Sequence, residues 1–113
     1  MLIVSGHVVV KAEARDELLA AVAPVLSAIR TEDGVVDYCL SADPVHDDRV
    51  TVLEIWASVE QLQTHLDHPN HRDMGKVMAK FRPRGGSVTK YRVNASAPMI
   101  GADGKPNLDF PES

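Results

Sequence analysis

Glu54, Trp56 and His65 lie within one short segment, and their side chains could together bind and deprotonate a flat molecule. Glu54 and Trp56 fall in a strand-like run, where alternation places them on one face of a sheet. His65 falls on the helix expected next. An imidazole exchanges a proton near neutral pH, so His65 is a candidate base or proton shuttle. An indole can stack on a planar ligand or donate its N–H, so Trp56 could orient a substrate.

Ordinary packing could also account for these residues. His65 could be a helix-end residue that donates to a carbonyl group, and Trp56 a core aromatic. Glu54 should be half-buried and therefore needs a partner, such as Arg92 or a histidine. For Glu54 we expect such a structural pairing rather than catalysis.

A pocket at this corner would draw residues from other elements as well. The candidate substrate-binding residues are Ser5, His7, Tyr38, Glu54, His71, Met74, Met78 and Phe81. For His7 and Tyr38, a surface or core-edge position is an equally good interpretation. For Met74, Met78 and Phe81, whose spacing is helical, so is ordinary core packing.

His65, His68 and His71 repeat every third residue, a spacing that could suit a metal ion. The His68–Pro69 step should break the helix between them, so the three imidazoles need not converge. We therefore expect no metal site.

The elements that must position these residues follow from apolar periodicity. Strands are expected over residues 2–10, 35–41, 49–57 and 87–93, and helices over 14–31, from a Ser58 cap onward, and from Pro69 to residue 81. The order β-α-β-β-α-β predicts a ferredoxin-like α+β fold, a four-stranded antiparallel sheet with its helices on one face. The other face would be bare, which predicts a homodimer joined through the sheet faces. Residues 95–113 are predicted to form an extended C-terminal arm, which we expect to be ordered only if it packs against another surface.

Composition narrows the function classes. A formal net charge of −4 gives no basic surface for nucleic acid, and no apolar run is long enough to cross a membrane. The start of the chain lacks the features of a signal peptide. Cys39 is the single cysteine, which fits a reducing cytoplasm, and we expect it to be a small buried side chain.

The segment Glu54-Ile-Trp-Ala-Ser-Val-Glu-Gln-Leu-Gln-Thr-His-Leu-Asp-His-Pro-Asn-His71 resembles the antibiotic biosynthesis monooxygenase (ABM) family. Glu32-Asp-Gly-Val-Val-Asp-Tyr38 is similar to the family's entry to its second strand. The resemblance spans residues 1–94. It implies a dimeric α+β barrel and a quinol-type monooxygenase that oxidises a small phenolic or quinol-like aromatic with O₂, without metal, flavin or haem.

Other functions occur on similar scaffolds. Haem-degrading relatives use an asparagine, a tryptophan and a histidine where this chain has Ser5, His65 and Gly75, so haem degradation fits less well. A non-oxidative isomerase remains an alternative, and so does a non-catalytic module that binds small aromatics.

Overall fold

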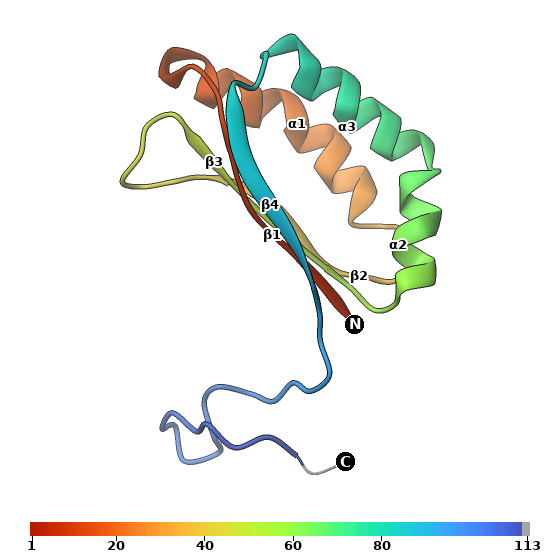
Figure 1. Ribbon diagram of the computed structural model, residues 1–113, viewed down its shortest axis with the longest axis vertical. Coiled ribbons are helices and arrows are strands. Elements are labelled where there is room, and N and C mark those ends of the chain that lie inside the picture. Colours follow the sequence, from red (N-terminus) through yellow and green to blue (C-terminus); the bar gives the residue numbers. More distant parts are fainter. Residues whose placement is uncertain (112–113) are drawn as a thin grey trace.

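One antiparallel sheet carries three helices on one face in the computed structural model, which describes residues 1–111 (Figure 1). The elements are β1 (Leu2–Val9), a 3₁₀ turn (Ala12–Ala14), α1 (Arg15–Ile29), β2 (Val35–Ala42), β3 (Arg49–Trp56), α2 (Val59–Leu66), α3 (Pro69–Lys80) and β4 (Gly85–Arg92). The strand order is β2-β3-β1-β4, with every neighbouring pair antiparallel. The ferredoxin-like α+β prediction is therefore confirmed.

Helix α1 buries the apolar stripe that its sequence predicts. Leu18, Val22, Leu26 and Ile29 are its buried residues, and they face the sheet and α3. Pro24 lies inside α1, and the helix continues through it. A proline removes one helical hydrogen bond, so burial of this stripe has to outweigh that loss.

Helices α2 and α3 begin where the sequence places their caps. The Ser58 hydroxyl accepts from the backbone N–H of Gln61 at 3.1 Å. Pro69 is the first residue of α3, and the His68 imidazole caps that helix by accepting from the Asn70 N–H at 3.0 Å. The two caps fix the corner at which α2 turns into α3.

The register of β1 separates the two faces of the sheet. Leu2 is buried under the helices, and Val4 and Gly6 share its face because side chains alternate. Ser5 and His7 consequently point to the opposite face. No helix of the described residues covers that face (Figure 1).

Strand β4 is the exposed edge of the sheet. Every residue of β4 is exposed, since the helices lie over the other strands. It nevertheless approaches β1 closely at Gly6, where an added Cβ atom would overlap the Ser87 carbonyl oxygen and lie 2.7 Å from the Val88 Cα. The β1–β4 pairing therefore depends on a glycine at this position.

Residues 94–111 leave the sheet and extend away from it (Figure 1). Their local structure is a small turn closed by the bridge between Ile100 and Pro106. The Cα radius of gyration is 16.0 Å, above the roughly 13 Å expected for a compact chain of this length. The exposed large apolar residues of this arm are Met99, Ile100, Leu108 and Phe110.

Candidate functional site

The inner face of β3 presents Glu54 and Trp56 side by side. The Trp56 indole is fully buried, and its Nε1–H donates to Glu54 Oε1 at 3.0 Å. The partner of Glu54 is thus this indole, and not Arg92 or a histidine as the sequence suggested. Because the indole N–H is occupied, Trp56 can orient the Glu54 carboxyl group but not donate directly to a ligand.

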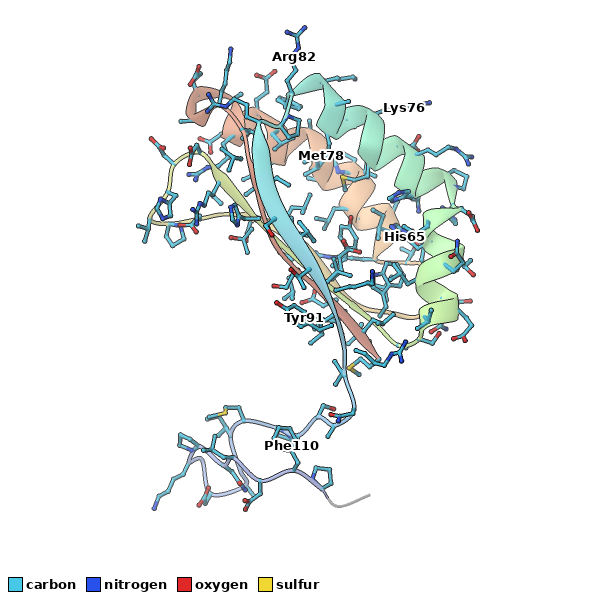
Figure 2. The ribbon with its side chains drawn as sticks, viewed as in Figure 1. His65, Lys76, Met78, Arg82, Tyr91 and Phe110 are labelled. Carbon is cyan, nitrogen blue, oxygen red and sulfur yellow. The ribbon has the colours of Figure 1, made fainter. Side chains whose placement is uncertain are left out.

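His65 lies in the last turn of α2, between that helix and the sheet (Figure 2). Its side chain is 2% exposed, and its Nδ1 lies 3.0 Å from Glu32 Oε1 and 3.2 Å from Oε2. The amide of Asn70 donates to Glu32 Oε2 at 3.2 Å. A carboxylate can only accept, so the His65 ring must carry a proton on Nδ1. In the neutral ring Nε2 is then free to exchange a proton.

Glu32 reaches His65 from the turn between α1 and β2. Gly34 in this turn has a φ of 86°, a conformation that suits glycine and few other residues. The turn thereby returns the chain to β2 and leaves Glu32 against the end of α2. Its side chain is 9% exposed, so the Glu32–His65 pair is largely shielded from water.

Four rings form a cluster behind Glu54. The ring centroids of Trp56 and His65 are 4.7 Å apart, and those of His65 and His71 are 5.1 Å apart. Tyr38 contributes the fourth ring, 5.9 Å from His65 and 6.5 Å from Trp56. The cluster joins β2, β3, α2 and α3.

Burial makes Glu54 a stronger base than an exposed carboxylate. Loss of solvation raises its pKa, although the Trp56 hydrogen bond and the nearby imidazoles of His65 and His71 act in the opposite direction. Burial also raises the pKa of Tyr38, with a further contribution from the charges of Glu54 and Glu32. Tyr38 is therefore a neutral phenol at physiological pH.

An open cleft of about 590 Å³ lies next to this cluster. Its lining residues are Val4, Glu54, Leu62, Leu66, Val88, Thr89 and Lys90. Helix α2 forms one wall of the cleft, and β1 with β4 forms the other. The cleft is open because no helix covers the edge strand β4. Glu54 connects the two: it lines the cleft, and its carboxyl group accepts a hydrogen bond from Trp56 of the ring cluster.

The structure brings together five of the residues predicted from the sequence: Tyr38, Glu54, Trp56, His65 and His71. Ser5 and His7 lie on the opposite face of the sheet, so the structure does not bring them to this cleft as the sequence analysis expected. Met74 is buried in the core, and Met78 and Phe81 pack against it. These three belong to the core and do not line the cleft.

Glu32, Asn70 and Lys90 were not predicted. Glu32 and Asn70 meet His65 only through the fold, since 33 residues separate Glu32 from His65 in the sequence. Lys90 could have been noticed in the sequence, because it is the one lysine within the four predicted strands. Cys39, expected to be buried, is half-buried instead.

Within residues 1–111, no group of three or more His, Cys, Asp and Glu side chains is placed to hold a metal ion. The imidazole of His68 is used as the α3 cap, so it does not join His65 and His71. No helix of the described residues is long and apolar enough to span a membrane.

Fold and site together define a small ferredoxin-like α+β protein with an open cleft lined by Glu54 and a buried histidine–carboxylate pair nearby. The sequence profile of the family described as antibiotic biosynthesis monooxygenase matches residues 1–77. The chain belongs to this family. The match confirms the family that the sequence resembled, and with it the general class of a monooxygenase-type enzyme. No curated protein matches the chain closely enough to count as a relative.

Solved structures share the fold at low sequence identity. A proposed antibiotic biosynthesis monooxygenase from Deinococcus radiodurans has a TM-score of 0.78 at 23% identity, over 89% of this chain and 100% of that one. A second, from Nitrosomonas europaea, has a TM-score of 0.74 at 12% identity over 83% and 99%. A third, from Caulobacter crescentus, has a TM-score of 0.73 at 18% identity over 80% and 86%.

Proposed function

We propose that the protein is a monooxygenase that oxidises a small phenolic or quinol-type aromatic with O₂ and needs no cofactor. The observation that carries this proposal is the position of Glu54, a half-buried carboxyl group that lines an open cleft and has the imidazoles of His65 and His71 close by. Family membership supports the reaction class, and the aliphatic side chains of Val4, Leu62 and Leu66 in the cleft support an apolar substrate such as an aromatic ring.

The first step is removal of the phenolic proton. Glu54 accepts it, because its carboxyl group lines the cleft and has one oxygen not bonded to Trp56. His65 serves as the proton shuttle: its charge acts on the pKa of Glu54, and its contact with Glu32 through Nδ1 leaves Nε2 to exchange a proton. The phenolate is a much better electron donor than the phenol.

The phenolate then transfers one electron to O₂, and the resulting aryloxyl radical combines with superoxide at a ring carbon that bears hydrogen. Protonation gives a hydroperoxide. The base removes the ring proton, the O–O bond breaks, and hydroxide leaves with a proton as water. Phenol and O₂ thus give a quinone and water, and each product receives one of the two atoms of O₂. Val4, Leu62 and Leu66 supply the apolar surface against which the radical pair forms.

Oxygen consumption by the purified protein tests the proposal, with tricyclic phenols and quinols as substrates. His65→Ala should slow turnover about 100-fold, the usual scale for loss of a proton-transfer group. His46→Ala is the matched control, since His46 is exposed in the β2–β3 turn. Equal oxygen uptake by His65→Ala and the control would refute the role of His65. Substrate conversion without oxygen uptake would refute oxygenation and favour an isomerase.

We also propose that two copies pair through their open sheet faces. Ile3 is flanked by Ile55 and Tyr91 on that face, and Tyr91 is 53% exposed. A row of three large apolar side chains without a covering layer favours burial against a second copy. The exposed arm of residues 94–111 offers further apolar side chains for the same assembly.

A further inference from the structure

The floor of the cleft is a row of three residues across neighbouring strands. Val4 of β1 pairs with Glu54 of β3 on one side and with Lys90 of β4 on the other. Directly paired residues point to the same face of a sheet, here the face that carries the helices. All three residues line the cleft. The apolar floor at Val4 is therefore bounded by a carboxyl group and an ammonium group.

The spacing of this row fits a flat ligand of two fused rings. Neighbouring strands lie about 4.8 Å apart, so the backbones at Glu54 and Lys90 are roughly 10 Å apart. Leu62 and Leu66 of α2 form the wall above the floor. A ring system lying on Val4 would direct one end to each charged group.

The two ends of the cleft recognise different chemical groups. Glu54 offers an acceptor to a hydroxyl group, since only one of its oxygens is bonded to Trp56. Lys90 is exposed, and it forms no ion pair with another of the described residues. Its ammonium group is thus available to an anion, and ammonium groups bind carboxylates through charge-assisted hydrogen bonds.

We propose that Lys90 determines specificity, and that the cleft takes phenols which carry a carboxylate at the end of the ring system opposite to the hydroxyl group. This inference rests on the proposed function for the orientation of the substrate, because the reacting hydroxyl group is the one assigned to Glu54. The anionic end stays at the open edge of the sheet, where the charge loses least of its solvation. Lys90 is a binding residue and takes no part in the chemistry.

Calorimetric titration without oxygen tests the inference, because it measures binding in the absence of turnover. The probes are 6-hydroxy-2-naphthoate, which has the two groups at opposite ends, and 2-naphthol, which lacks the carboxylate. The native protein should bind the naphthoate more tightly than the naphthol, and added salt should reduce that preference.

Lys90→Gln should weaken binding of the naphthoate about tenfold, the size of one charge-assisted hydrogen bond, and leave 2-naphthol unchanged. Lys90→Arg should retain the preference. Lys76→Gln is the matched control, because Lys76 projects from α3 away from the sheet (Figure 2). It should bind both probes as the native protein does.

Equal weakening of both probes by Lys90→Gln, no weakening of either, or failure of the native protein to prefer the naphthoate would each overturn the inference. The proposed function fails separately. Lys90-dependent binding without oxygen consumption would contradict the monooxygenase proposal and leave the anion-selective cleft intact.

Discussion

Replacing Glu54 by glutamine should stabilise the protein at neutral pH, because burial makes the native carboxylate unfavourable. The loss of solvation raises the pKa of Glu54 above its ordinary value of 4.5, despite the opposing effects of Trp56, His65 and His71. The folded protein therefore holds this proton more tightly than the unfolded chain does. Glutamine keeps the size of the side chain and an oxygen that can accept from the indole, so the change mainly removes the charge.

The sign follows from proton linkage. As pH rises above 4.5, the unfolded chain loses this proton first, so the native protein loses stability until the pH passes the raised pKa. At pH values above the raised pKa, each unit by which the pKa is raised lowers the free energy of unfolding by about 1.4 kcal/mol. For a domain of this size, a gain of about 1 kcal/mol raises Tm by about 4–6 °C.

Thermal unfolding followed by circular dichroism between pH 3.5 and pH 8 measures the effect. The Tm of Glu54→Gln should exceed that of the native protein at pH 8, and the two should converge at pH 3.5, where both side chains are neutral. Glu60→Gln, a change at an exposed position in the first turn of α2, is the control and should not raise Tm at pH 8, because a carboxylate at a helix N-terminus is favourable. A lower Tm for Glu54→Gln at pH 8 would mean that the imidazoles stabilise the carboxylate more than burial penalises it.

Substitutions at three further positions test other parts of the structure. Glu32→Ala leaves the buried donor on His65 and the half-buried donor on Asn70 without an acceptor, and it should cost about 2–5 kcal/mol in urea unfolding. Glu32→Gln should lie in between, and equal stability of the native protein and both variants would contradict the pairing. Gly6→Ala should lower stability by about 3 kcal/mol through the clash with β4, and an unchanged Tm would show that β4 can shift. Tyr91→Asp should shift the protein towards the monomer in analytical ultracentrifugation, and an unaltered mass would argue against pairing through the open face.

The fold could be predicted because local signals agreed with one another. The capping residues Ser58 and Pro69, and the apolar stripe of α1, each indicated an element that the structure contains. The choice of sheet face was less predictable. Ser5 and His7 were assigned to the pocket without the register that places them on the other face.

Part of the site could be predicted as well. Glu54, Trp56 and His65 are close in sequence, so local structure brings them together. Glu32 and Lys90 join them only after the α1–β2 turn closes and β4 pairs with β1. The apolar periodicity of one sequence predicts helices and strands, but it does not predict contacts between residues that are far apart in that sequence. The hydrogen bond between Trp56 and Glu54 could not be predicted either, because it depends on the rotamers of both side chains.

Oxygen uptake with a fused-ring phenol by the native protein and Glu54→Gln is the most direct test of the account. The carboxyl group should be the acceptor of the first proton. The native protein should consume one O₂ per quinone formed, and Glu54→Gln should do so at least about 100 times more slowly while still binding the phenol. Undiminished oxygen uptake by Glu54→Gln would contradict the central claim that this carboxyl group starts the reaction.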